Sequence, residues 1–255
     1  MSSRVLKRVI NDVKITFTLQ MSDAVATGEV KPHIEVLNHK ITYWIRYSTP
    51  LTHSNVVLWV EQNEEYLFDY YTRFFDARDL SRYVYEEGEK HPYLGKDYPF
   101  KINLHDKSGV CAIDLKDNKF VVDISAGFPN KKEAIALLLK KWYNNSAYNY
   151  FKERSEFYRK KMPFVPDDGD LIIKIVESKK FHGRCTSGKR LVEYNYPTIK
   201  LAPDIIDYLV VHELCHFKEH NHKPPFWRLV RQYCPRYKQL DMDIDVKAII
   251  YCRGI

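Results

Sequence analysis

Apolar and polar residues alternate along much of the first half of the chain, and this pattern predicts strands. Residues 4–20 alternate with the two-residue period expected of a strand that buries one face. Residues 33–47 repeat this period on either side of residues 38–39, which predicts a hairpin. From residue 55 to about residue 87 the pattern becomes aromatic and helical, and it predicts two helices with a break near Asp76.

The middle of the chain returns to strands and then changes to a long helix. Strand-like alternation covers residues 93–124. Asn130 and Glu133 have the spacing of a capping box, which predicts the start of a helix that runs toward Met162. A short apolar run at residues 171–177 predicts one more strand.

The C-terminal part of the chain is predicted to form two helices that follow a basic connection. Residues 178–200 are basic and contain glycine, which is typical of a loop. Pro203 fits the first turn of a helix, where its missing N–H would have no helical partner. A second helix is expected to begin at Pro225 and to end at Pro235. A β-rich N-terminal half, a long helix, one or two strands and these two helices together predict an α+β fold.

The first of these helices contains the motif His212-Glu213-x-x-His216. Residues four apart lie on one face of a helix, so both imidazoles can point at one metal ion. Glu213 is too close along the chain to bind the same ion easily, yet it can contact a water molecule on that ion. This arrangement is typical of a zinc hydrolase with a glutamate general base. The motif also arises by chance, but the apolar residues at 205–211 favour a metal site here.

A catalytic zinc ion uses three protein ligands and a water molecule, so a third ligand is expected. His220 continues the four-residue spacing, but it would lie about 12 Å from His212 along a straight helix. Zinc–nitrogen bonds of about 2 Å cannot close that gap. His222 can reach the ion if the helix ends near residues 219–221, where Asn221 tolerates a left-handed cap. We therefore choose His222 as the third ligand and keep His220 as the less favoured alternative.

Composition and charge limit the classes of protein that this chain can be. Of the 255 residues 45% are apolar and 14% are aromatic, which excludes a disordered chain. The net charge of +7 permits attraction to nucleic acid without requiring it. Five scattered cysteines without C-x-x-C spacing indicate reduced thiols. The N-terminus does not resemble a signal peptide and no apolar run could span a bilayer, so we expect a cytoplasmic protein without membrane contact.

Several short segments together resemble the YgjP-like metallopeptidases, which are relatives of the SprT-like and minimal gluzincin zinc proteases. The likeness extends from about residue 90 to residue 235. Three departures are visible. The family's W-G-S-C segment is His182-Gly183-Arg184-Cys185 here, extra residues separate Cys185 from Ala202, and the segment at residues 55–90 is longer than usual. The matching segments are Tyr93-Leu-Gly-Lys-Asp-Tyr, Trp142-Tyr143, Gly183-x-Cys185-x-Ser187, Ala202-Pro, Asp207-Tyr-Leu-Val-Val-His-Glu-Leu-Cys-His, Asn221-His222 and Phe226-Trp227.

The resemblance implies a fold and a set of roles. The implied fold is a zincin-like, minimal-gluzincin core of helix, strand and metal helix at residues 126–255. Before it stands a β-rich region at residues 1–125 with a helical insert at about residues 55–90. The resemblance also implies His222 as the third metal ligand and Glu213 as the catalytic acid and base.

The expected activity is zinc-dependent hydrolysis of peptide bonds in a peptide or protein substrate. Zn²⁺ held by His212, His216 and His222 would activate a water molecule and polarise the carbonyl. Glu213 would take the proton of this water and return it to the leaving amine. A strand at residues 171–177 could pair with an extended peptide if it lies at an exposed edge near the site. Candidate donors to the oxyanion are His182, Arg184, Tyr194 and Tyr196.

Two other activities stay open at this point. The same metal and base could hydrolyse a non-peptide bond, such as a nucleotide phosphoanhydride, if the basic residues at 179–190 hold phosphates. Alternatively, those residues form an ordinary solvated turn. The chain could also be a DNA-associated protease, or a non-catalytic module in which zinc is structural. No helix-turn-helix or zinc-finger motif supports a role in reading DNA sequence.

Overall fold

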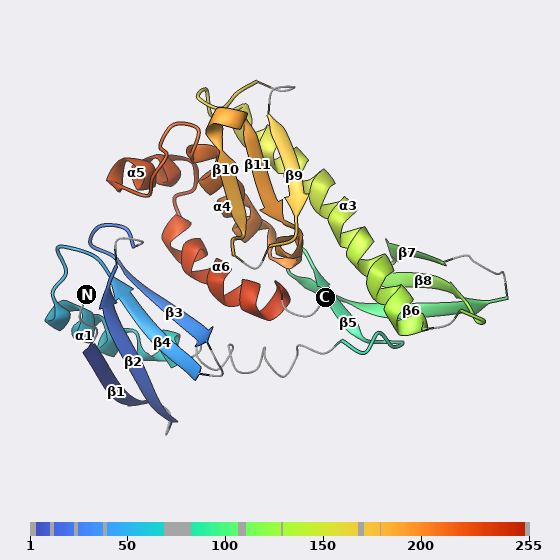
Figure 1. Cartoon of the computed structure of the whole chain (residues 1–255), viewed down its shortest axis with the longest axis horizontal. Helices are drawn as coiled ribbons and strands as arrows, with labels where there is room; N and C mark the ends of the chain where they lie inside the picture. The colour runs from blue at the N-terminus through green and yellow to red at the C-terminus, as the bar shows by residue number, and fades with distance from the viewer. Residues whose placement is uncertain are drawn as a thin grey trace. The chain divides into compact units, whose positions relative to one another are not determined.

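A computed structural model gives the arrangement of the chain, which is mixed α+β as predicted (Figure 1). The described part contains three small sheets and one long helix. It forms two compact units, residues 1–79 with 219–246 and residues 80–218 with 247–255. These units do not follow the boundary at residue 125, and that domain division stays a prediction. The structure describes residues 4–10, 13–22, 25–37, 40–68, 83–106, 111–128, 130–167, 171–178 and 180–252.

The first unit contains a four-stranded sheet with the order β1-β2-β4-β3. Strands β1 and β2 pair antiparallel, β2 and β4 pair parallel, and β3 and β4 form the predicted hairpin. Ile15, Phe17 and Leu19 are buried on one face of β2, as their alternation predicts. The strands are β1 (Arg4–Ile10), β2 (Val13–Met21), β3 (Val30–Leu37) and β4 (Lys40–Tyr47).

The single strand expected at residues 4–20 is therefore two strands. Both have a two-residue period, and such a period does not mark where the chain reverses direction. Helix α1 (His53–Gln62) follows the sheet and begins with a capping box between Thr52 and Asn55. It confirms the first of the two helices expected in this region. The expected break near Asp76 lies outside the described residues. This unit also contains α5 (Pro224–Tyr233) and most of α6 (Tyr237–Cys252).

The second unit begins with a sheet of order β5-β6-β8-β7, in which β6 and β8 are parallel and the other pairs are antiparallel. Phe100, Phe120, Val122 and Ile124 are its fully buried apolar residues. These strands confirm the alternation seen in the sequence. They are β5 (Lys90–Tyr93), β6 (Lys96–His105), β7 (Cys111–Lys116) and β8 (Lys119–Ser125).

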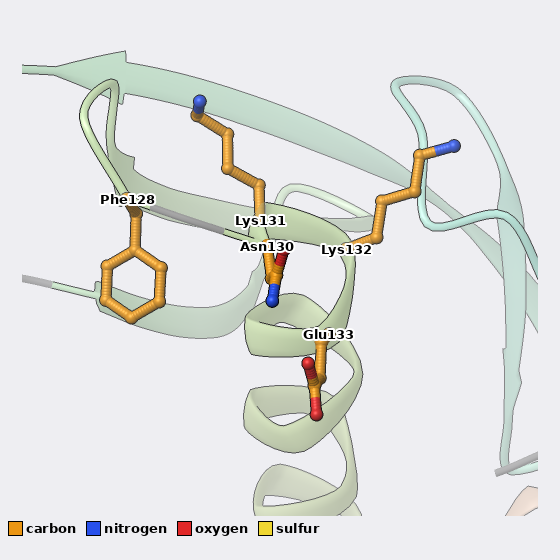
Figure 2. A pocket seen from close by; sticks show the side chains of 5 residues that line it. All are labelled: Phe128, Asn130, Lys131, Lys132 and Glu133. Carbon is orange, nitrogen blue, oxygen red and sulfur yellow. The ribbon is translucent and has the colours of Figure 1, made fainter.

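Helix α3 (Lys131–Arg159) has 29 residues and connects this sheet to the next one. It begins where predicted, but Asn130 adopts a left-handed conformation and makes no side-chain cap, so the expected capping box does not form. Figure 2 shows the side chains that line a shallow pocket at this helix start. One face of α3 is buried at a four-residue spacing, by Ile135, Leu139, Tyr143, Ala147, Phe151 and Ser155.

A three-stranded sheet of order β10-β11-β9 follows α3. Strand β9 (Ile172–Val176) confirms the predicted apolar strand. Strands β10 (Gly183–Thr186) and β11 (Leu191–Asn195) occupy the segment that was expected to be a loop. The loop prediction was wrong because these strands have only four and five residues and flank a basic turn with Gly188. Arg184 and Glu193 face each other across the pair and form a salt bridge.

Helix α4 (Pro203–Cys215) begins at the predicted proline and packs against α3 and β10. Arg154 of α3 and Asp207 of α4 form a two-pronged ion pair, with nitrogen–oxygen distances of 2.6 and 2.8 Å. Tyr194 of β11 stacks on Phe151 of α3, with their ring centroids 4.2 Å apart. These contacts fix the helix that contains the motif against both the sheet and the long helix.

Candidate metal centre

The apolar residues of helix α4 are almost entirely buried. Its last turn contains His212 and Glu213, the first two polar residues of the motif. The regular helix ends at Cys215, earlier than the end expected near residues 219–221. The N–H groups of Phe217 and Lys218 donate to carbonyls three residues back, which tightens this last turn. Cys215 itself is a fully buried core residue.

The chain turns back after α4, but not by the expected left-handed cap at Asn221. Asn221 is absent from the residues with positive φ, and its side chain instead accepts a hydrogen bond from the Lys223 N–H at 3.2 Å. Helix α5 then begins at Pro224, one residue before the predicted start. The sequence was right about the reversal and wrong about its mechanism, because an Asx-type turn uses the same residue type as a left-handed cap.

His212, His216 and His222 each offer a ring nitrogen to a common point, and these three atoms lie within 4.8 Å of one another. Nitrogens around a tetrahedral zinc ion at about 2.0 Å lie about 3.3 Å apart. Three imidazole nitrogens this close together are a donor set of the kind that zinc binds. Among the residues that the structure describes, His220 is not part of this group.

Each histidine of this triad has a neighbour that limits its ring. The ring centroids of His212 and His216 lie 5.2 Å apart at an angle of 75°. His222 is exposed, and it stacks on Trp227 with a centroid distance of 5.8 Å. The indole N–H of Trp227 also donates to the carbonyl of His222 at 2.9 Å. Phe226 contacts the edge of the same imidazole, with centroids 4.8 Å apart.

Tyr208 is a residue of the site that the sequence reasoning missed. Its hydroxyl lies 3.2 Å from Nδ1 of His212 and the side chain is 2% exposed. A proton on Nδ1 can donate to this hydroxyl, which leaves the Nε2 lone pair of His212 for a metal ion. Tyr208 stands four residues before His212, so the spacing on the helix face was a signal that could have identified it.

Glu213 is buried beside the triad, with an exposed fraction of 5%. Burial raises the pKa of its carboxyl to about 8, and a hydrogen bond from the Cys185 N–H opposes this rise in pKa. Burial and the nearby charge of Glu213 raise the pKa of the Cys185 thiol to about 12. A carboxyl whose pKa lies near neutrality can both accept and release a proton at physiological pH.

Three of the four residues expected to stabilise an oxyanion are buried or held by other contacts. Tyr194 is fully buried, stacks on Phe151 and shares a hydrogen bond with Ser155. Tyr196 is 2% exposed, and Arg184 is held by Glu193 at 2.6 and 2.8 Å. The role of His182 stays a prediction.

Strand β9, the predicted partner of an extended peptide, lies at one edge of its sheet. The strand that contacts α4 is β10 at the opposite edge. The two are separated by β11, so β9 is not the strand beside Glu213.

Two histidines one turn apart on a helix, a third after the following turn and a buried glutamate define the class of metal-dependent hydrolases. The chain belongs to the YgjP-like metallopeptidase family, whose metallopeptidase domain matches residues 33–246. No curated protein matches the chain. None of the helices in the described ranges is long and apolar enough to cross a membrane.

The chain is also similar to a solved structure, the metallopeptidase zymogen of Pyrococcus abyssi abylysin. The likeness covers 41% of this chain and 98% of that chain, with 20% sequence identity and a TM-score of 0.35.

Proposed function

We propose that this protein is a zinc-dependent metallopeptidase of the gluzincin type that cleaves peptide bonds in a peptide or protein substrate. The observation that carries the proposal is the convergence of the His212, His216 and His222 nitrogens within 4.8 Å. Membership of a metallopeptidase family supports the choice of a peptide bond. Three neutral imidazoles with one position left for water are typical ligands of catalytic zinc.

Each residue of the site has a distinct role in this proposal. The triad would hold the zinc ion, which would lower the pKa of a bound water and polarise the substrate carbonyl. Glu213 accepts a proton from the attacking water and later donates it to the leaving amine. Tyr208 orients His212, and Trp227 limits the movement of His222.

The test compares metal content and proteolysis in the purified protein and two variants. We expect about one zinc ion per chain and cleavage of denatured casein. Glu213→Gln should keep the zinc and lose at least about a hundredfold in activity. His222→Ala should lose the zinc, whereas the matched variant His220→Ala should keep it, because His220 lies outside the triad.

Three results would contradict the proposal. Release of phosphate from nucleotides without peptide cleavage would indicate the phosphoanhydride hydrolase. Salt-sensitive DNA binding that persists without zinc, with no hydrolysis, would indicate a non-catalytic module. Full proteolytic activity in Glu213→Gln would exclude Glu213 as the general base.

A further inference from the structure

Gly183, the first residue of β10, lies against the side chain of Glu213. A Cβ atom at this position would stand 2.7 Å from Oε1, 2.8 Å from Cγ and 2.9 Å from Cδ of Glu213. All three atoms belong to that one side chain. Real Cβ atoms do not come this close to other heavy atoms, so any larger residue at position 183 would displace the carboxylate.

A second contact from the same strand holds Glu213. The backbone N–H of Cys185 donates a hydrogen bond to the carboxylate. Residues 183 and 185 lie on one face of β10, because side chains alternate along a strand. Arg184 between them forms a salt bridge with Glu193 of β11. Strand β10 packs against α4 (Figure 1). It provides a position without a side chain at residue 183 and, two residues on, a backbone N–H donor.

We propose that Gly183 is a positioning residue for Glu213. Its missing side chain lets β10 approach α4 closely enough for the Cys185 N–H to fix the carboxylate beside the histidine triad. The expected effect of Gly183 on catalysis rests on the proposed function. Its expected effect on the position of Glu213 rests on packing alone. A displacement of about 1 Å in a catalytic group can lower a rate by about a hundredfold.

The first experiment compares Gly183→Ala with Gly188→Ala in the full chain. Gly188 is a matched control, because a Cβ there meets nothing within 4 Å and its backbone is not in the left-handed region. Gly183→Ala should lower kcat for casein-derived peptides by at least about tenfold, with KM and bound zinc unchanged. Gly188→Ala should leave kcat, KM and zinc unchanged. An unchanged kcat in Gly183→Ala, or a fall that Gly188→Ala shares, would overturn the inference.

The second experiment is independent of enzyme activity. Gly183→Ala is made in the wild-type chain and in Glu213→Ala, where the three atoms that would clash are absent. In the wild type the substitution should lower Tm by at least about 3 °C, which corresponds to a modest loss of stability in a chain of this size. In Glu213→Ala it should cause no further fall, because the two sites are coupled.

This double-mutant comparison distinguishes a failure of the inference from a failure of the proposed function. If the protein does not cleave peptides, the Tm comparison still decides whether Gly183 makes room for Glu213. If Gly183→Ala does not fold, recovery of folding in the double variant supports the inference. An equal fall in Tm in both backgrounds, or a double variant that also fails to fold, overturns it.

Discussion

The hydrogen bond between Tyr208 and His212 gives a sharp prediction about metal affinity. In Tyr208→Phe the ring stays in its buried position and only the hydroxyl at 3.2 Å from Nδ1 is removed. The Nδ1 proton of His212 then loses its acceptor, and the ring is less firmly held in the tautomer and orientation that present Nε2.

The size of the effect follows from the type of hydrogen bond. A neutral hydrogen bond contributes about 0.5–1.5 kcal/mol net, which corresponds to about a two- to twelvefold change in a binding constant. The upper half of this range applies because Tyr208 is 2% exposed and water cannot easily replace its hydroxyl. We therefore expect zinc to bind about five- to tenfold more weakly to Tyr208→Phe.

The assay is a competitive titration of the metal-free protein with zinc and a chromogenic chelator. Tyr143→Phe is the matched control, because it also removes a buried tyrosine hydroxyl, which donates to the Pro92 carbonyl at 2.6 Å. This variant should be less stable without a change in zinc affinity. An affinity of Tyr208→Phe equal to that of the wild type, or the same loss in Tyr143→Phe, would refute the reasoning.

The first of three further predictions concerns His91, a buried residue of β5, and the other two concern contacts that hold the site. Burial among aromatic rings lowers the pKa of His91 to about 4, so between pH 6.5 and 4 the unfolded chain binds a proton that the folded chain does not. The free energy of unfolding should therefore fall by about 3 kcal/mol over this range, as measured by urea denaturation at pH 4.5 and 7. This fall should be absent in His91→Phe. Asp207→Asn should lower the unfolding free energy by about 2 kcal/mol in the same assay, and a loss below about 0.5 kcal/mol would mean that solvent screens its pair with Arg154. Trp227→Ala should weaken zinc binding by about tenfold by freeing His222, and unchanged affinity would exclude this role of the indole.

Local spacing explains why the triad could be predicted from the sequence. His212 and His216 are four residues apart, so they lie on one face of any helix that contains both. The position of His222 followed from the need for a third ligand within reach of a short turn. The predicted left-handed cap at Asn221 was wrong, but the predicted reversal of the chain was right. Few conformations can bring the chain back within six residues, so the reversal does not depend on the type of turn.

The parts that the sequence did not reveal depend on contacts between distant residues. Nothing near Gly183 in the sequence indicates that Glu213, thirty residues later, will lie against it. Strands β10 and β11 are short, and they form because β11 pairs with β10 on one side and with β9 on the other. The alternation at residues 4–20 likewise could not show the reversal between β1 and β2, since a two-residue period does not mark the point where the chain turns.

Because α3 is long and regular, it holds its two ends at a fixed distance from each other. The distance along the helix axis from Lys131 to Ser155 is about 36 Å, at a rise of 1.5 Å per residue. Its C-terminal end is tied to α4 through Arg154 and Asp207, whereas its other end follows Gly127, where an added side chain would meet nothing within 4 Å. A fluorescent dye at Gly127 would therefore report, by energy transfer, when a labelled peptide arrives beside α4, without touching the residues that bind it.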